Sequence, residues 1–340
     1  MHTTVGTMKI RQPRVHDKRE GEHFRSSLLP PFVRRTMAVD ALVPVLYLHG
    51  VSTTRMTEVL KEMVGAEFST MSASVVTKII ERWQVEYRQW SERRITKRYV
   101  YVWVDGIYTR VRTTNDRPCM LVVIGCDERG NKEVLAVVDG ERESELSWTH
   151  VLTDLKRRGL APPQLAIGDG ALGFWNAMSK VYPSTTHQGC TVHALRNCLG
   201  KLPKSVHGEA KSMFQDIFTA PTREEADKAL TAFEATFKAK YSRAVDTIAR
   251  RYQMLIAFYA FPAEHWKSIR STNVIESTFA TIRRRSKQTN GNASRDAAIA
   301  MIYALAIHAQ RTWRKLDGFH HIANVLNGVA YINGERKEAA

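Results

Sequence analysis

The spacing of apolar residues predicts helices in the first part of the chain and strands after it. In 39–48, 53–64 and 72–90, apolar residues recur every three or four positions, which is the period of an amphipathic helix. From Tyr99 to Asp105 the sequence instead alternates valine with aromatic residues, a pattern typical of a central strand. The chain therefore changes from helical to strand-forming structure at about residue 99.

The elements predicted after this strand follow the order of a known fold. In chain order they are strands at 119–126 and 133–138, a helix at 144–158, a strand at 164–169, a helix at 171–182 and a strand at 189–193. The resulting order, β-β-β-α-β-α-β, is that of the ribonuclease-H-like fold, a mixed five-stranded sheet with helices on its faces. We therefore predict an α/β protein with a ribonuclease-H-like core.

The length of the chain predicts several folding units. A chain of 340 residues is long for one compact domain, and 195–265 have an almost entirely helical pattern, including a capping box from Thr222 to Glu225. The predicted parts are a basic flexible arm (1–35), a helical DNA-binding region (36–95), the first part of the core (96–194), an all-α insertion (195–268), the final part of the core with a catalytic helix (269–318) and a C-terminal tail (319–340).

The helices before the sheet suggest a helix-turn-helix. Residues 57–64 would form its first helix, 65–71 its turn and 72–90 its recognition helix. The side chains that this last helix would offer to a DNA groove are Ser74, Lys78 and Arg82. The alternative is a small helical bundle in which apolar residues of the same helix, such as Ile79 and Trp83, are simply core. The pattern does not decide between the two.

Charge narrows the class of partner. The chain has 50 Lys and Arg against 34 Asp and Glu, a net charge of +16. Such an excess favours nucleic acid, because each neutralised phosphate releases a counterion, although a membrane surface or a ribosome would attract it too. No stretch is apolar enough to span a membrane, and the four cysteines are too sparse for a disulfide framework. We therefore expect a cytoplasmic protein.

Three carboxylates stand where a site for two metal ions could form. Asp105 and Asp169 each end an apolar strand, and Glu276 lies in the first turn of the helix that begins at Asn273. Two-metal cleavage of a phosphodiester needs carboxylates from different elements to hold Mg²⁺ or Mn²⁺. Taken alone, each acid fits a turn or a helix cap better than a metal site. Asp139 repeats the local pattern of Asp105 and is set aside only by its predicted place in the sheet.

A basic stripe follows the third acid. Arg283, Arg284, Arg285 and Lys287 continue the helix of Glu276, and Arg283 lies on nearly the same face as the glutamate. A carboxylate beside a basic stripe suits DNA. The alternative is a solvated basic face that only keeps the helix soluble.

Cys190 and His193 form a second local group. With His187 and Cys198 nearby in sequence, they could complete a four-ligand zinc site. The irregular spacing and the predicted strand favour instead a packing or hydrogen-bonding role, with Cys190 acting as a small buried apolar residue. Structural zinc is therefore not expected.

Several separated motifs together resemble one family. They are Val104-Asp-Gly-Ile-Tyr108, Ile167-Gly-Asp-Gly-Ala-Leu-Gly-Phe-Trp175, Cys190-Thr-Val-His193, Thr272-Asn-Val-Ile-Glu276 with its continuation to Arg283, Leu29-Pro-Pro-Phe-Val-Arg-Arg35, Lys156-Arg-Arg-Gly159 and Phe261-Pro-Ala-Glu-His-Trp266. In their order along the chain, these motifs resemble those of the bacterial Mutator-type insertion-sequence transposases, from about residue 28 to 315.

The resemblance implies a fold, an activity and partners. It implies a ribonuclease-H-like core interrupted by a helical insertion, with Asp105, Asp169 and Glu276 as the three metal-holding acids. It implies that the enzyme hydrolyses DNA at the terminal inverted repeats of an insertion sequence and uses the new 3′-hydroxyl ends to attack a target, with no covalent protein intermediate. We expect double-stranded DNA and further copies of the chain as partners, at the bacterial nucleoid.

Some positions depart from the family pattern. Family members usually carry several tens of residues ahead of the equivalent of Met1, so we expect impaired recognition of element ends. Val274 stands where a proline is usual, and Gly189 where an arginine is usual, which could weaken helix preorganisation and a phosphate contact. The competing hypotheses are a truncated or domesticated DNA-binding regulator and a nuclease that acts on structured nucleic acid.

Overall fold

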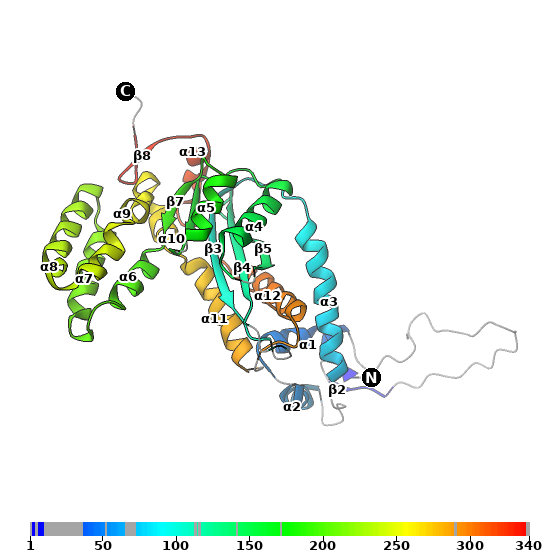
Figure 1. The fold of residues 1–340 in the computed structure, drawn as a ribbon. Helices are drawn as coiled ribbons and strands as arrows, with labels where there is room; N and C mark the ends of the chain where they lie inside the picture. Colours follow the sequence, from blue (N-terminus) through cyan, green and yellow to red (C-terminus); the bar gives the residue numbers. More distant parts are fainter. Residues whose placement is uncertain are drawn as a thin grey trace, which may run out of the picture.

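A mixed five-stranded sheet lies at the centre of the molecule (Figure 1). The computed structural model describes residues 2–3, 6–9, 37–51, 53–64, 73–111, 114, 117–140, 142–170, 172–288 and 291–337. The sheet has the order β5-β4-β3-β6-β7, from β3 (Tyr99–Tyr108), β4 (Cys119–Asp127), β5 (Lys132–Asp139), β6 (Leu165–Gly168) and β7 (Thr186–Gly189). Strands β3, β4 and β5 pair antiparallel, whereas β6 and β7 run parallel to β3. The α/β class is confirmed, and this layout is consistent with a ribonuclease-H-like core.

Helices cover both faces of the sheet because its strands are apolar on both sides. Val102 and Val104 pack with α4 (Glu145–Arg157) and α5 (Leu172–Val181) on one face. Trp103 and Ile107 belong to the core on the other face, where α11 (Asn273–Gln288) and α12 (Arg295–Gln310) lie. The alternation that predicted the strand thus sends successive side chains of β3 into two separate cores.

The helices before the sheet have the bounds α1 (Met37–Leu48), α2 (Thr53–Val64) and α3 (Ala73–Glu92), close to the predicted ranges. Helix α3 packs along α12, where Tyr303 stacks near Tyr87 and Trp90 at ring distances of 5.7 and 4.9 Å. The predicted turn at 65–71 lies outside the described residues, so the helix-turn-helix stays a prediction. A short hairpin, β1 (His2–Thr3) with β2 (Gly6–Thr7), was not predicted.

The predicted strand at 189–193 is wrong. Strand β7 ends at Gly189, and helix α6 (Thr191–Leu199) begins immediately after it. The strand was missed because Gln188 is polar yet fully buried: its amide donates to the carbonyl oxygens of Gly189 and Leu255, and its own oxygen accepts from the backbone N–H of Phe258. A buried polar group needs such partners, which lie far along the chain.

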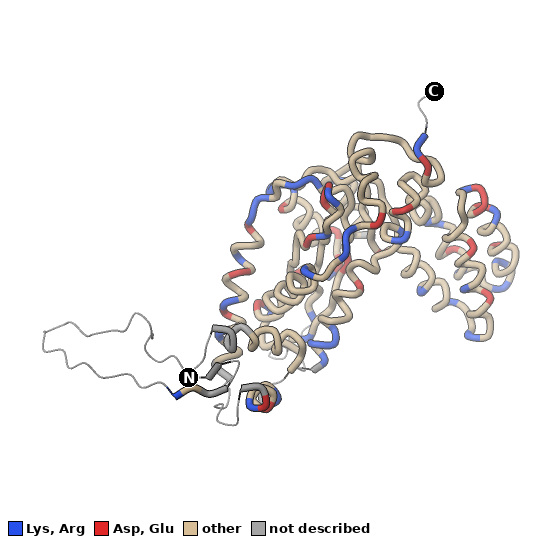
Figure 2. Tube along the Cα trace, turned by 180° about the vertical axis from the view of Figure 1, so that it is seen from behind, with Lys and Arg blue, Asp and Glu red and all other residues tan. Residues whose placement is uncertain are grey.

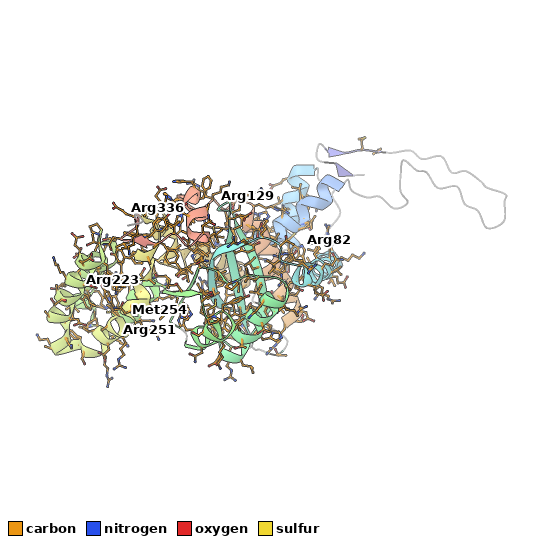
Figure 3. The ribbon with its side chains drawn as sticks, turned by 90° about the horizontal axis from the view of Figure 1, so that it is seen from above. Arg82, Arg129, Arg223, Arg251, Met254 and Arg336 are labelled. Atoms are coloured by element: carbon orange, nitrogen blue, oxygen red, sulfur yellow. The ribbon has the colours of Figure 1, made fainter. Side chains whose placement is uncertain are left out.

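Every regular element between β7 and α11 is helical, and this whole stretch is described. After α6 come η1 (Lys204–Val206), α7 (His207–Thr219), α8 (Arg223–Ala249), α9 (Tyr252–Leu255), η2 (Ala257–Ala260), η3 (Ala263–His265) and α10 (Trp266–Ile269). The Thr222 hydroxyl accepts from the N–H of Glu225, as the capping pattern predicts. Helices α7 and α8 stand away from the sheet in Figure 1, and Arg223 and Arg251 lie on the other side of the sheet from Arg82 (Figure 3).

Part of the predicted C-terminal tail packs on the body. It contains η4 (Phe319–His321), α13 (Ile322–Leu326) and a hairpin of β8 (Tyr331–Ile332) and β9 (Glu335–Arg336). Ile322, Val325 and Tyr331 are buried in the same core as α11 and α12. These three spaced apolar residues anchor 319–336, the larger part of the predicted tail, to the body of the molecule. In the part of the chain that the structure describes, no helix is long and apolar enough to cross a membrane.

Candidate active site

Two of the predicted acids lie on neighbouring parallel strands or directly after them. Asp169 follows β6, as predicted, but Asp105 lies within β3, which continues to Tyr108 because its later residues still pair with β4. In the register between β3 and β6, Trp103 lies opposite Ile167. Continuing that register by two residues brings Asp105 level with Asp169. Because side chains alternate along a strand, both acids point to the face that carries Trp103 and Ile167. The strand pairing therefore brings together carboxylates that are 64 residues apart in sequence.

Helix α11 brings the third acid to this face. It packs on β3 through the fully buried Ile275 and Phe279, and the indole N–H of Trp103 donates to the carbonyl oxygen of Ser268 just before the helix. Glu276 occupies the first turn of α11 and is half-buried. Asp139, in contrast, lies on the edge strand β5 and forms an ion pair with Arg295 at 3.2 Å. The structure thus groups Asp139 apart from the other acids.

A hydrogen-bonded group joins the start of α6 to the start of α11. The hydroxyl of the buried Thr272 lies 3.3 Å from Sγ of Cys190, 3.4 Å from Nδ1 of His193 and 3.4 Å from Oε1 of Glu276. The Thr272 N–H also donates to Sγ of Cys190 at 3.3 Å, and Nε2 of His193 lies 3.7 Å from Oε1 of Glu276. Cys190 and His193 therefore border the acidic site, which the predicted strand could not show.

The electrostatics of the site reflect burial and crowded charge. Burial raises the pKa of Asp105 to about 7; the imidazole of His193 acts against this shift, and the negative charge of Asp169 adds to it. The hydrogen bond with Cys190 raises the pKa of His193 to about 9, and both aspartates act in the same direction. Burial alone would raise the pKa of Cys190, but hydrogen bonds from His193 and Thr272 bring it below its usual value. These interactions favour the protonated form of His193 beside the acids.

A fourth carboxylate, Glu143, borders the site and was missed. It precedes α4, and burial together with the charge of Asp169 raises its pKa. Gly106 faces it closely: a Cβ on this glycine would lie 2.6 Å from Cδ of Glu143 and 2.8 Å from Sγ of Cys119. No sequence pattern marked Glu143, because it stands in a connecting segment among several acids. The one signal in the sequence was Gly106 directly after Asp105, because a glycine there leaves room for another side chain beside the acid.

The ligand groups that come close together differ from the predicted zinc set. Among the described residues, two groups have ligand atoms within 4.8 Å of one another: Cys190 with His193 and Glu276, and Glu264 with His320 and His321. His187 instead stacks on Trp175, and Cys198 is buried on α6. The four-residue zinc set is therefore not assembled. Asp105, Asp169 and Glu276 do not form such a compact group among the described residues.

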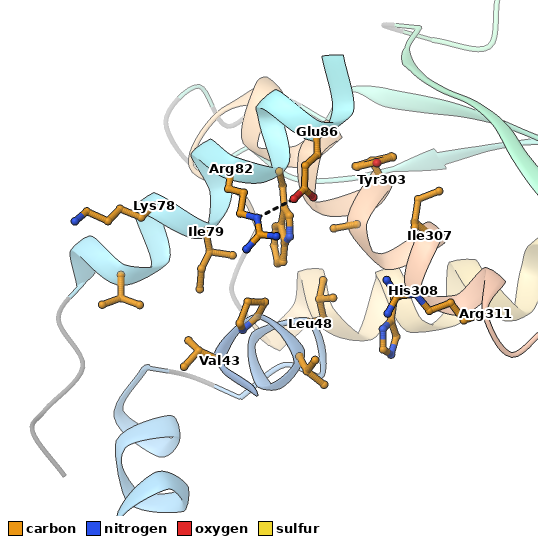
Figure 4. A pocket seen from close by; sticks show the side chains of 15 residues that line it. Val43, Leu48, Lys78, Ile79, Arg82, Glu86, Tyr303, Ile307, His308 and Arg311 are labelled. Carbon is orange, nitrogen blue, oxygen red and sulfur yellow. Dashed lines mark hydrogen bonds and ion pairs between the residues drawn. The ribbon is translucent and has the colours of Figure 1, made fainter. Parts of the chain in front are cut away.

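The candidate DNA contacts on α3 lie beside a hollow. Lys78 and Arg82 are exposed, and Nε of Arg82 forms an ion pair with Glu86 at 2.8 Å (Figure 4). Together with apolar residues of α1, α3 and α12 they line a hollow of about 550 Å³. The side chain of Ser74 lies outside the described residues.

The basic stripe of α11 is divided by burial. Arg283, Arg284 and Lys287 are exposed near the C-terminal end of α11. Figure 2 shows Lys and Arg gathered toward that end of the helix. The side chain of Arg285, in contrast, is 1% exposed, and its guanidinium lies 4.0 Å from the centre of the Tyr47 ring. Arg285 is therefore removed from the predicted DNA contacts, because it joins α11 to α1 inside the core.

This mixed sheet gathers one carboxylate from within β3 and one from just after β6, beside a histidine of α6 and a glutamate of α11. Such a cluster on an α/β sheet is suited to binding cations. The family described as "Transposase, Mutator family" matches residues 1–316. The transposase for insertion sequence element IS6120 of Mycolicibacterium smegmatis is 44% identical over 301 residues, which cover 88% of this chain and 93% of that protein. The transposase for element IST2 of Acidithiobacillus ferrooxidans is 39% identical over 281 residues, 82% of this chain and 95% of that protein. The chain therefore belongs to the Mutator family of transposases, enzymes that cleave and join DNA strands.

Proposed function

We propose that this transposase cuts and joins DNA at the ends of an insertion sequence by two-metal phosphodiester hydrolysis and strand transfer. Asp105, Asp169 and Glu276 would hold the two divalent cations, Mg²⁺ or Mn²⁺. The observation that carries the proposal is the register of β3 with β6, which brings Asp105 level with Asp169 on the face covered by the helix of Glu276.

The donor set fits hard divalent cations. Carboxylate oxygens are the ligands that Mg²⁺ and Mn²⁺ prefer. Burial and like charge raise the pKa of Asp105 to about 7, so the ionised carboxylate lacks sufficient compensation from the protein alone. A bound cation would supply that compensation. When present, the ions would activate the attacking oxygen and stabilise the leaving one.

The residues of the chain would orient the acids. Thr272 lies close to Glu276 and to Cys190 at once, so it would fix the rotamer of the glutamate relative to α6. The positive charge of His193 would partly offset the negative charges around it. Asp105 would be held by the backbone of β3, which restricts its motion more than a loop would, and Asp169 directly follows β6.

DNA would be bound by basic side chains outside this site. The exposed Lys78 and Arg82 on α3 and Arg283, Arg284 and Lys287 on α11 are the proposed contacts, with double-stranded ends and target as substrates. We further propose that 36–95 recognise DNA through the predicted helix-turn-helix, that the helices between β7 and α11 are an inserted domain, and that several copies act together in the cytoplasm at the nucleoid.

The test is a strand-cleavage and strand-transfer assay with purified protein and labelled duplexes that end in the inverted repeats flanking the gene. We expect metal-dependent nicking and joined products from the wild type and none from Asp105→Asn. Binding without any cleavage would identify a DNA-binding regulator instead. Cleavage of structured nucleic acid without joined products would identify a nuclease.

A further inference from the structure

A basic hollow lies between α6 and α8, outside every DNA contact proposed above. It has a volume of about 470 Å³. The residues that line it are Asn197 and Lys201 from α6 and the turn after it, and Arg243, Asp246, Thr247, Arg250 and Arg251 from the second half of α8 and its end. Helix α8 has non-helical backbone angles at Tyr241, and the lining residues from α8 and its end all follow this kink. The kink therefore sets the direction of the wall that faces α6.

This hollow continues toward the acidic site. A narrower cavity shares Asn197, Thr247 and Arg251 with it and is also lined by Gly170 and Cys190. Gly170 follows Asp169 directly, and a Cβ on Gly170 would overlap the guanidinium of Arg251. Figure 3 shows Arg251 at the junction of these helices with the sheet. Arg251 therefore lines the hollow and also lies against Gly170, the residue after the proposed catalytic acid Asp169.

The charge of the hollow is strongly unbalanced. Lys201, Arg243, Arg250 and Arg251 contribute four cations, whereas Asp246 is the single carboxylate, an excess of three positive charges. Asp246 pairs with Arg250 at 2.9 Å, and Nζ of Lys201 donates to the Thr247 hydroxyl at 2.7 Å. A solvated basic face would spread such charges over a convex surface. Here they converge on one concavity from two helices, which raises their mutual repulsion unless an anion is bound.

We propose that this hollow binds backbone phosphates of the DNA that flanks the scissile position, so that the helices after β7 hold the substrate strand against the acids. The inference rests on the proposed function, since it takes Asp169 to be part of the cleavage site. Arginine suits phosphate because its planar guanidinium donates two parallel hydrogen bonds, and the amide of Asn197 adds a neutral donor. The hydroxyl of Thr247 instead donates to the carbonyl oxygen of Arg243 and accepts from Lys201. Phosphate contacts of this kind bind without reading sequence.

The test compares two double variants with the same loss of charge. Lys201→Ala with Arg243→Ala removes two cations of the hollow. Lys211→Ala with Lys228→Ala removes two exposed lysines of α7 and α8 that do not line it. Binding to a fluorescent duplex is measured in EDTA at several salt concentrations, for end-bearing and unrelated sequences, and single-turnover cleavage is measured with Mg²⁺.

We expect the hollow variant to bind both duplexes at least about tenfold more weakly than the control at low salt. The slope of log binding constant against log salt concentration should become shallower by roughly two, because each lost phosphate contact removes about 0.9 from that slope. The exposed Arg243→Ala alone, which is not expected to disturb folding, should give about half that change. Equal affinity and slope for the hollow and control variants would overturn the inference. If the wild type binds DNA without cleaving it, the proposed function fails instead, and the binding comparison still decides the role of the hollow.

Discussion

Nε2 of His193 lies 3.7 Å from Oε1 of Glu276, and the same imidazole interacts electrostatically with Asp105 and Asp169. One side chain at the start of α6 therefore lies close to the acid of α11 and within electrostatic range of the acids on β3 and directly after β6. Thr272 fixes this arrangement from the other side through its contacts with Cys190 and Glu276. The relationship makes the site a junction of four elements, and the following predictions test it.

Removing any of the three acids should abolish cleavage without unfolding the protein. Asp105→Asn, Asp169→Asn and Glu276→Gln should each lower the rate roughly a thousandfold, because a lost metal-holding carboxylate costs several kcal/mol of transition-state stabilisation. The matched control is Asp139→Asn, which repeats the Asp-Gly sequence on the edge strand. Single-turnover rates with Mg²⁺ measure the effect, and a rate for Asp139→Asn as low as for Asp105→Asn would contradict the assignment.

Thr272 should act as a positioning residue. Thr272→Val keeps the shape but removes the hydroxyl near Glu276, so we expect the cleavage rate to fall roughly tenfold, about one hydrogen bond, while the Kd for DNA is unchanged. Thr272→Ser keeps the hydroxyl and should restore most of the rate. If valine and serine lower the rate equally, the role of Thr272 is packing alone.

Asp105→Asn should stabilise the protein in EDTA. The folded-state pKa of Asp105 lies near 7 against an ordinary value of 3.8, so the ionised group costs stability, and the cost grows as the pH rises from about 4 to about 7. At pH 8 the neutral amide should raise the free energy of unfolding by on the order of 1 kcal/mol, discounted for coupling to its neighbours. Urea titrations at pH 8 and pH 4 measure this, and the gain should vanish at pH 4. A loss of stability at pH 8 would show that the carboxylate is well compensated without metal.

Arg285 and Arg284 should behave oppositely although they are adjacent. Arg285→Ala removes a buried guanidinium from the ring of Tyr47 and should lower the free energy of unfolding by about 2–3 kcal/mol. Arg284→Ala should change stability by less than about 0.5 kcal/mol but weaken DNA binding. Chemical denaturation and anisotropy titrations separate the two effects. Similar stability losses for both would refute the difference in their positions.

Gly106 should tolerate no side chain. In Gly106→Ala the new methyl group would meet Glu143 and Cys119, so we expect a loss of about 1–3 kcal/mol in unfolding free energy. Cys119→Ala removes the sulfur atom that the new methyl group would meet. Gly106→Ala should therefore cost less unfolding free energy in the Cys119→Ala background than in the wild type. A double-mutant cycle measures the coupling. Additive effects would place Cys119 outside the clash.

The sequence by itself determined most of the elements and the class of the fold. Alternating valine and aromatic residues marked β3 because burial on both faces leaves that pattern, and helical spacing marked α1, α2 and α3. The identity of Asp105, Asp169 and Glu276 as candidates also came from sequence, through element order and family resemblance. The local pattern failed where the core is polar: Gln188 made β7 look unlike a strand, so the bounds of β7, the start of α6 and the place of His193 were predicted wrongly.

Only the tertiary structure decided which side chains meet. The register of β3 with β6 aligns the aspartates, and the packing of α11 determines that Arg285 is buried while Arg284 is exposed. The run of basic and polar residues at 283–286 does not show which arginine is buried, because burial depends on which face of α11 is covered by α1. Glu143 and the hollow between α6 and α8 likewise arise from segments far apart in the chain. Local patterns report the period of an element, whereas a site is a set of long-range contacts that only the packed fold defines.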